Sequence, residues 1–195
     1  MQKLIVNGGK RLRGELKLQG CKNSSLPIMA GTILCGEECV LDNCPELTDI
    51  YSASRILNGL GGKCRFSDNR AVVNSADMNM TEIPEKLMRE MRSSIIFMGA
   101  ILGRTGECTV SMPGGCELGS RPIDMHISAM RKMGIDVKES YGKIICRAVS
   151  GKAHGAKISL PFPSVGATEN IILCAVTADG ETIINNSARE PEICD

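Results

Sequence analysis

Three stretches of the chain share one order of apolar and polar positions. In each, a strand-like apolar run leads into a short polar loop that contains proline, and an aspartate then opens a helix-like pattern. The three stretches are residues 40–49, 110–124 and 183–195. Their aspartates, spaced about 70 to 75 residues apart, are Asp49, Asp124 and Asp195. This spacing predicts a structural unit that repeats along the chain.

The pattern after the first two aspartates predicts the same elements in the same order. An amphipathic helix pattern ends in each case at glycine, at Leu60-Gly61-Gly62 and at Met133-Gly134. Glycine is favoured just after the last apolar position of a helix, because it adopts positive φ without steric cost. A β-hairpin pattern follows, turning at Ser67-Asp68-Asn69 in the first copy and at Tyr141-Gly142 in the second.

A second helix pattern recurs once in each unit and begins with small polar or charged residues. Its openings are Lys22-Asn23-Ser24-Ser25, Arg92-Ser93-Ser94 within a longer helix from about Pro84, and Gly166-Ala167-Thr168. Serine and threonine satisfy free backbone N–H groups where they cap a helix start. The chain is therefore expected to be an α/β protein, built from βαβαββ-like units of about 70 to 75 residues.

About two and a half of these units are expected in the chain. The third unit ends at Asp195, before the helix and hairpin that follow the aspartate in the other two copies. Because one repeat cannot bury its apolar face alone, we expect the sequence to be part of a longer chain.

The composition narrows the classes of protein that this pattern allows. With 195 residues and 43% hydrophobic content, the chain can bury a sizeable core. Its formal net charge is +1, from 23 basic and 22 acidic residues, which argues against nucleic acid or an anionic membrane as a partner. No apolar run is long enough to span a bilayer, and the start lacks the apolar stretch of a signal peptide. A cytoplasmic protein is therefore expected.

The cysteine pattern favours reduced thiols over disulfides or a metal centre. The ten cysteines are spread singly, without a CxxC pair, and the sequence contains two histidines. The closest cluster, Cys35, Cys39 and Cys44, lacks the ligand spacing of a zinc site. Most of these cysteines are interpreted as small core residues, and no metal is expected.

The loop from Pro113 to Arg121, with the sequence PGGCELGSR, combines residues suited to chemistry on an anion. Its glycines allow the backbone to approach a ligand closely, and Arg121 offers a planar fork that matches phosphate or carboxylate. A thiol near fixed positive charge has a lowered pKa and increased reactivity. Cys116 is therefore the candidate general acid or nucleophile. The alternative is a tight turn that contains a cysteine by chance.

Two further stretches place suitable groups at predicted helix starts. Lys22-Asn23 opens a helix pattern, where a lysine adds its charge to the anion-friendly N-terminus. Residues 164–169 follow Pro161-Phe162-Pro163 and form a loop that enters a helix N-terminus. Backbone N–H groups there could meet an anion, although ordinary helix capping explains the same pattern.

The positions of Arg92 and His126 each allow two interpretations. Arg92 lies in the charged stretch 85–92, which is also typical of a solvated helix face. His126 lies two residues after Asp124 and faces away from the apolar stripe of its predicted helix. It is therefore expected to be exposed to solvent or to face a site.

Six motifs along the whole chain together resemble the UDP-N-acetylglucosamine enolpyruvyl transferase family, within the EPSP synthase superfamily. The motifs are Lys22-Asn23-xx-Leu26-Pro27, Met91-Arg92-Ser93-Ser94, Pro113-Gly114-Gly115-Cys116, Gly119-x-Arg121-Pro122-x-Asp124-x-His126, Ser164-Val165-Gly166-Ala167-Thr168 and Ala188-Arg189-Glu190-Pro191-Glu192. They occur in order and without large gaps, and a linked set is far more specific than any single motif.

The resemblance implies a fold and a reaction. The fold is a lobe shaped like an inside-out α/β barrel, one of two lobes of three repeats that enclose the active site. The reaction transfers the enolpyruvyl group of phosphoenolpyruvate to the 3-hydroxyl of UDP-N-acetylglucosamine, with release of phosphate, by addition and then elimination. It starts peptidoglycan precursor synthesis, which supports cell shape and division. The resemblance implies no metal and no organic cofactor.

The resemblance also implies roles for individual residues. Cys116 would donate a proton to the methylene carbon, can form a covalent adduct, and would be the thiol alkylated by fosfomycin. Lys22 and Arg121 would act in catalysis and hold phosphoenolpyruvate together with Asn23. The residues implied for UDP-N-acetylglucosamine are Asn23, Arg92, Arg121, Pro122, Ile123, Asp124, Met125, Ser164, Val165 and Gly166.

This sequence departs from the family in one side chain and in length. Some members have a lysine where this chain has Phe162, so a nucleotide contact from that side chain is absent. Residues 1–20 would be strands that pack with the missing C-terminal lobe, and residues 21–195 would form the first catalytic lobe, cut at the start of its third repeat. The isolated chain is therefore expected to have negligible turnover.

Two alternatives stay open beside that function. The chain could be a non-catalytic fragment that binds the UDP-sugar. It could also belong to the related 3-phosphoshikimate 1-carboxyvinyltransferase, which shares the repeats and phosphoenolpyruvate. The Pro-Gly-Gly context of Cys116 argues against the second alternative, because that enzyme does not resemble this loop.

Overall fold

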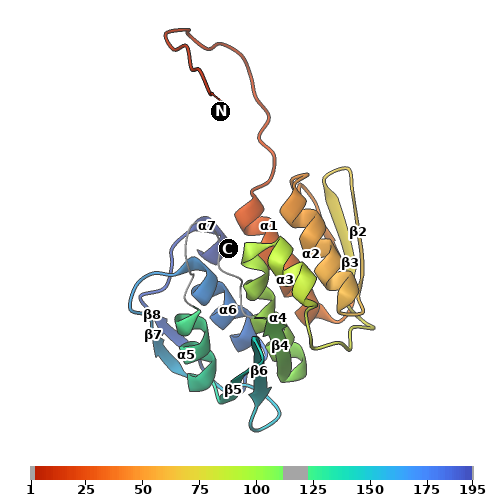
Figure 1. The fold of residues 1–195 in the computed structure, drawn as a ribbon, viewed down its shortest axis with the longest axis vertical. Helices are drawn as coiled ribbons and strands as arrows, with labels where there is room; N and C mark the ends of the chain where they lie inside the picture. Colours follow the sequence, from red (N-terminus) through yellow and green to blue (C-terminus); the bar gives the residue numbers. More distant parts are fainter. Residues whose placement is uncertain (1–2, 112–122, 195) are drawn as a thin grey trace.

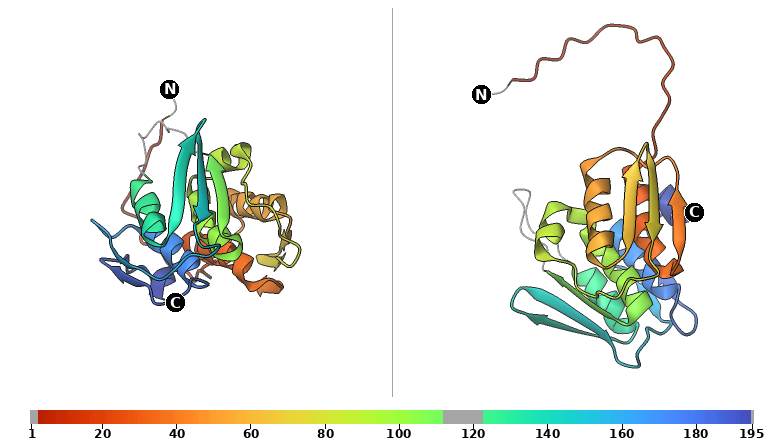
Figure 2. Two further views of the ribbon diagram at one scale, coloured as in Figure 1. Left: turned by 90° about the horizontal axis from the view of Figure 1, so that it is seen from below. Right: turned by 90° about the vertical axis from the view of Figure 1, so that its right-hand side faces the viewer.

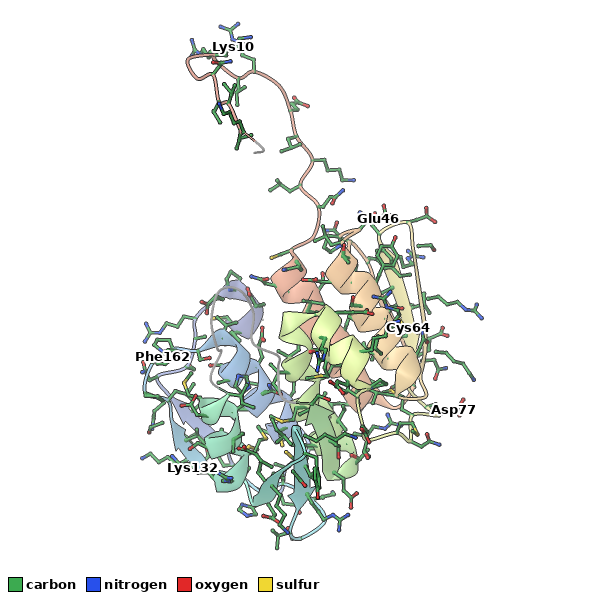
Figure 3. The ribbon with its side chains drawn as sticks, in the orientation of Figure 1. Lys10, Glu46, Cys64, Asp77, Lys132 and Phe162 are labelled. Atoms are coloured by element: carbon green, nitrogen blue, oxygen red, sulfur yellow. The ribbon has the colours of Figure 1, made fainter. Side chains whose placement is uncertain are left out.

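The computed structural model describes residues 3–111 and 123–194, with the Arg92 side chain excepted (Figure 1). Residues 3–20 lead into the first helix without forming a helix or strand of their own. In the side-chain view, Lys10 lies on this segment, well away from the rest of the chain (Figure 3). Leu4 and Leu12 on the segment are more than nine-tenths exposed, at 92% and 93%.

The remaining elements form three successive units, as the spacing of the aspartates predicted. The first unit contains α1 (Lys22–Cys35), β1 (Glu38–Leu41), α2 (Thr48–Gly59), β2 (Lys63–Ser67) and β3 (Arg70–Asn74). The second contains α3 (Glu85–Glu90), the 3-10 helix η1 (Arg92–Ile96), α4 (Phe97–Thr105), β4 (Glu107–Ser111), α5 (Asp124–Lys132), β5 (Ile135–Ser140) and β6 (Lys143–Ala148). The third contains β7 (Lys157–Ser159), α6 (Val165–Ala175), β8 (Ile183–Asn185) and α7 (Pro191–Cys194).

The sheets repeat one topology. The first two have the antiparallel orders β1-β3-β2 and β4-β6-β5, while β7 and β8 pair in parallel. β4 has the same kind of parallel neighbour, because Thr109 forms a parallel bridge with Glu82. β8 therefore occupies the position in the third unit that β4 occupies in the second and β1 in the first.

The hairpin turns and helix ends agree with the predictions from the sequence. Asp68 and Asn69 turn the first hairpin with φ of 51° and 58°, and Tyr141 and Gly142 turn the second with φ of 48° and 73°. Two consecutive residues with positive φ are typical of the two-residue turns that match strand twist. α2 ends at Gly59, one residue before Leu60, and α5 ends just before Met133.

Helices lie inside this molecule and sheets outside, which confirms the predicted inside-out α/β arrangement (Figures 1 and 2). α1, α4 and α6 pack against one another, while α2 covers the first sheet and α5 the second. The inner helices are buried, with Met29, Phe97 and Ile171 fully inaccessible to solvent. Burial of this apolar surface is the main driving force for the fold.

α4 and α6 approach closely because Gly99 has no side chain. A Cβ at Gly99 would lie 2.3 Å from the carbonyl oxygen of Asn170. Gly99 is therefore required at this contact between the two helices, because any side chain would push them apart.

The single helix expected from about Pro84 through Arg92 is instead interrupted, so that prediction was wrong. α3 ends at Glu90, and Met91 is extended with φ −130° and ψ 116° before η1 begins. The extended backbone buries the Met91 side chain, which is 1% exposed. Arg89 pairs with Glu85 on the exposed side of α3, so Glu85, Lys86, Arg89 and Glu90 form a solvated face while Met88 is buried.

Candidate functional site

The three inner helices begin at the same end of the structure. Near their C-termini, Arg104 Nη1 of α4 donates to the Ile33 carbonyl of α1 at 2.7 Å. Thr177 Oγ1, just after α6, donates to the Gly103 carbonyl of α4 at 2.6 Å. The helices therefore run in parallel, and the starts of α1, η1 and α6 face one side. Backbone N–H groups at helix starts attract anions, so this end is the candidate functional site.

The start of α1 stabilises negative charge. Cys21 is the residue before the helix, and backbone N–H groups of Ser24 and Asn23 lower the pKa of its exposed thiol. These N–H groups favour the thiolate, as expected for a helix N-terminus. Lys22 and Asn23, both predicted to hold phosphoenolpyruvate, are exposed in the same turn.

Lys22 is held by a residue that the sequence analysis used only as a marker of the repeat. Its Nζ lies 2.9 Å from Oδ2 of Asp49, which lies in the first turn of α2. The Lys22 side chain remains 46% exposed and Asp49 30% exposed, so the pair lies at the surface. The recurrence of aspartate after each proline loop was the available signal for Asp49.

The start of α6 is a capped helix N-terminus. The Ser164 hydroxyl accepts from the Ala167 N–H at 3.4 Å, which confirms the ordinary capping role. Thr168 Oγ1 accepts from the Ala188 N–H at 3.1 Å, and so holds the 188–190 segment against α6. Beside this start, Pro163, Asn186, Ser187, Arg189 and Glu190 line an open hollow of about 450 Å³.

His126 is buried, so the alternative in which it is exposed to solvent was wrong. Its side chain packs in the interior between α5 and α6 at 7% exposure, and its Nδ1 lies 2.8 Å from Asn170 Nδ2. Burial lowers the pKa of His126 to about 4, despite the nearby Asp124 carboxylate, which raises it. The ring is therefore neutral near pH 7 and accepts at Nδ1.

Asn170 joins the second and third units beneath the candidate site. Its Nδ2 donates to the Ile95 carbonyl at 2.9 Å and its Oδ1 accepts from the Gly99 N–H at 2.6 Å. With His126, these bonds use both donors and the acceptor of one buried side chain. The starts of η1, α5 and α6 are thereby held together, which the sequence alone did not predict.

A buried carboxyl group lies near the same end. Glu169 of α6 is 8% exposed, and burial raises its pKa to about 7, with further contributions from Glu192 and Glu190. Glu192 also acts on Cys21, so α7 lies near the starts of both α1 and α6. The sequence analysis missed Glu169, since its helical position gave no sign of burial.

The structure brings some predicted residues together and leaves others undescribed. Ile123 and Met125 are buried, at 8% and 7% exposure, while Asp124 between them is exposed. α5 packs on α6, and the His126 ring of α5 lies next to Gly166 of α6. The predicted residues outside the described part of the chain are Cys116, Arg121, Pro122 and Asp195, together with the Arg92 side chain.

The described ranges 3–111 and 123–194 contain no candidate metal centre and no candidate membrane span. No group of three or more potential metal-ligating side chains occurs there. None of the helices in these ranges combines the length and apolar character needed to cross a bilayer. Phe162, at the position where some family members have lysine, is 55% exposed at the edge of the structure (Figure 3).

The fold is similar to that of solved enolpyruvyl transferases. The enolpyruvyl transferase NikO from Streptomyces tendae aligns over 96% of this chain and 44% of its own, with a TM-score of 0.81 and 19% identity. An EPSP synthase from Acinetobacter baumannii aligns over 92% of this chain and 42% of its own, with a TM-score of 0.70 and 14% identity.

Curated relatives share more of the sequence. UDP-N-acetylglucosamine 1-carboxyvinyltransferase 2 of Caldanaerobacter subterraneus subsp. tengcongensis is 50% identical over 195 residues. UDP-N-acetylglucosamine 1-carboxyvinyltransferase of Chlorobium limicola is 45% identical over 194 residues. All or nearly all of this chain is covered, at 100% and 99%, but 46% of each relative. The chain thus spans about half the length of these relatives.

The family itself follows from a match over almost the whole chain. A model of the family described as EPSP synthase (3-phosphoshikimate 1-carboxyvinyltransferase) matches residues 6–195. The repeated units, the inside-out arrangement and the six motifs agree with this match. The chain therefore belongs to the EPSP synthase family of enolpyruvyl transferases.

Proposed function

We propose that this chain is the first part of a transferase that moves the enolpyruvyl group of phosphoenolpyruvate to the 3-hydroxyl of UDP-N-acetylglucosamine and releases phosphate. The observation that carries the proposal is the identity of 50% and 45%, across essentially all of this chain, with relatives that bear the name UDP-N-acetylglucosamine 1-carboxyvinyltransferase. The protein would then act in the cytoplasm at the first committed step of peptidoglycan synthesis.

Phosphoenolpyruvate would bind where α1 begins. Its phosphate and carboxylate need fixed positive charge and N–H donors, and the start of α1 offers both in Lys22 and in the groups that lower the pKa of Cys21. Asn23 would donate to the same ligand, and Arg121 would supply a planar fork from the 113–121 loop. These groups stabilise the charge that develops during addition and elimination.

Cys116 would supply the proton in this mechanism. Addition of the sugar hydroxyl to the central carbon of phosphoenolpyruvate requires a proton at its methylene carbon, and a positioned thiol can donate it. Loss of phosphate with a proton from the methyl group then regenerates the enol ether. The same thiol would form a covalent adduct with the substrate and would be alkylated by fosfomycin.

The UDP-sugar would lie across the starts of η1, α5 and α6. Asn23, Arg92 and the 121–125 segment would contact it from one side, and Ser164, Val165 and Gly166 from the other. Ile123 and Met125 are buried, so their contribution would come from the backbone. Asp124 is exposed at the start of α5 and can accept from a ligand hydroxyl or amide.

The second half of the site would come from a further lobe. Residues 21–195 would be the first catalytic lobe, and residues 1–20 would pack with the other lobe. The exposed apolar side chains of Leu4, Ile5 and Val6, at 78% to 92%, support this division. The 195-residue chain alone would show negligible turnover, because holding both reactants between two walls supplies much of the rate enhancement.

The test is phosphate release by the full-length protein that carries this chain. Phosphoenolpyruvate with UDP-N-acetylglucosamine should release phosphate, and phosphoenolpyruvate with shikimate 3-phosphate should not. Cys116→Ala should lower the rate by about 100-fold or more, as loss of a general acid does. Cys35→Ala, at the other end of α1, should leave it unchanged. Phosphate release with shikimate 3-phosphate alone would instead identify the synthase named in the family description.

Binding by the isolated chain is a separate question. Calorimetry of the 195-residue chain with UDP-N-acetylglucosamine distinguishes a fragment that binds the sugar nucleotide from one that does not. If the full-length protein is inactive while this chain binds the ligand, the non-catalytic alternative is the better account.

A further inference from the structure

The ion pair between Lys22 and Asp49 joins two helices at the proposed phosphoenolpyruvate site. Lys22 is the first residue of α1 and Asp49 the second residue of α2, and Nζ and Oδ2 lie 2.9 Å apart. Two other ion pairs of the first unit, Arg70 with Asp42 and Lys63 with Asp77, involve residues of the sheet and its loops. The Lys22 pair instead lies at the start of α1, where backbone N–H groups favour an anion.

The two partners differ in how firmly the fold holds them. Lysine carries its charge on a long, flexible stem, so Lys22 alone would sample many positions. Asp49 has a short side chain on a helix turn fixed by the core, because the next residue, Ile50, is completely buried. The Asp49 carboxylate therefore limits the positions that the Lys22 ammonium group can adopt.

Stability accounts for an aspartate at this position only in small part. An acidic side chain in the first turn of α2 interacts favourably with the helix N-terminus, an effect of less than about 1 kcal/mol at the surface. Ion pairs as exposed as this one contribute little to folding free energy. A carboxylate beside an anion site also repels the ligand, which weakens binding unless it performs another task. Fixing the lysine in a productive position is such a task, since small displacements of a binding group strongly reduce catalytic rates.

We propose that Asp49 is a positioning residue that holds the Lys22 ammonium group at the start of α1 for phosphoenolpyruvate. The inference rests on the function proposed above and adds a residue to it. Asp124 occupies the equivalent first turn of α5, so the inference assigns a role to the first-unit copy of the recurring aspartate. In the first unit, the repeated aspartate orients the charge that meets the reacting ligand.

Steady-state kinetics of the full-length protein test this role. Asp49→Asn should reduce kcat/KM for phosphoenolpyruvate by about 10- to 100-fold, as expected for a displaced binding group. Asp49→Glu, which keeps the charge, should recover part of that loss. Asp42→Asn is the matched control, because it removes an ion pair of similar length from the same unit, with Asp42 and Arg70 2.6 Å apart. It should change kcat/KM by less than about twofold.

A double-mutant cycle separates positioning from a structural role. In a Lys22→Ala background, Asp49→Asn should cause no further loss in kcat/KM for phosphoenolpyruvate. Thermal melts should place Asp49→Asn and Asp42→Asn at similar midpoints. If Asp49→Asn keeps wild-type kinetics, or if its loss is the same with and without Lys22, the inference is wrong. If the wild-type protein itself releases no phosphate with either acceptor, the proposed function fails, which is a distinct outcome.

Discussion

The two ends of the inner helices satisfy their backbone groups in different ways. At the C-terminal end, side chains donate to the free carbonyls: Arg104 to Ile33 and Thr177 to Gly103 between neighbouring units, and Ser75 to Thr32 within the first unit. At the N-terminal end, α1 and η1 begin without a side-chain cap, and Ser164 caps α6. Among the described residues, one end is thus closed by internal bonds, while the other leaves N–H groups available.

This difference indicates that the two ends of the inner helices have different roles, one in stability and the other in ligand binding. A free carbonyl or N–H group costs free energy if it is buried, so a closed end adds stability. An end that presents N–H groups to solvent adds less stability but can bind an anion. The lysine, the exposed asparagine and the start of α6 all occur at that second end. Variants at the two ends should therefore affect different properties of the protein.

The largest effect on stability is expected from the buried Asn170, which holds the open end together. Asn170→Ala leaves the Gly99 N–H, the Ile95 carbonyl and His126 without their partner and should cost about 2 to 4 kcal/mol of unfolding free energy. Urea denaturation measures this. Asn185→Ala, which removes an exposed bond to Ser159, should cost less than about 0.5 kcal/mol. Equal losses in both variants would show that the buried network does not organise this end.

A smaller loss is expected at the closed end. Arg104→Ala removes the donors to the Ile33 and Ala76 carbonyls and should cost about 1 to 3 kcal/mol. Substrate affinity of the full-length protein should be unchanged, because these bonds lie away from the helix starts. Arg89→Ala, on the exposed face of α3, is the control and should be close to neutral. Weaker substrate binding in Arg104→Ala would contradict the division between the two ends.

The pH dependence of stability should reveal two buried groups with opposite signs. The pKa of His126 is lowered to about 4 from 6.5, so its contribution to stability is lost as pH falls from about 6.5 towards 4. The pKa of Glu169 is raised to about 7 from 4.5, so its contribution is lost as pH rises from about 4.5 towards 7. His126→Gln should therefore flatten the acid side, and Glu169→Gln the neutral side, of a stability profile measured by urea titration.

Between pH 4.5 and 6.5 both groups lower wild-type stability, and their effects on its slope with pH are opposite. The two variants are each other's control. If both variants flatten the same side of the stability profile, one of the two groups does not have the pKa shift that its burial implies.

The smallest effect concerns thiol reactivity at the two ends of α1. Cys21 should react with iodoacetamide several-fold faster than Cys35 at pH 7, because backbone N–H groups lower the pKa of Cys21. Both thiols are exposed, so access does not explain a difference. Peptide mapping by mass spectrometry after short exposure measures both rates in one sample. A faster Cys35 would indicate that the start of α1 does not stabilise negative charge.

Local signals in the sequence predicted much of the fold. The glycines after α2 and α5 and the turns at Asp68-Asn69 and Tyr141-Gly142 depend on the backbone preferences of a few adjacent residues. The spacing of the aspartates revealed the repeat because each unit packs the same kinds of elements in the same order. Lys22 and Ser164 were found as helix starts for the same local reason, since capping and charge act within one turn.

Properties that depend on neighbours from another unit were predicted less well. His126 looked exposed because its helix has a separate apolar stripe, but α6 covers the other side as well. Met91 interrupts a helix pattern because burying its side chain outweighs the helical preference of the charged residues before it. Asp49 was visible only as a repeat marker, since its partner lies on another helix.

By itself, the sequence determined the repeat, the order of helices and hairpins, the helix starts and the family, because these follow from short-range periodicity and from motifs in order. Only the tertiary structure decided that the inner helices run in parallel and that Asn170 of α6 ties η1, α4 and α5 together. It also decided that Asp49 meets Lys22. Those contacts join residues 27 to 75 positions apart, as in Lys22 with Asp49 and Ile95 with Asn170, and their geometry depends on how whole units pack.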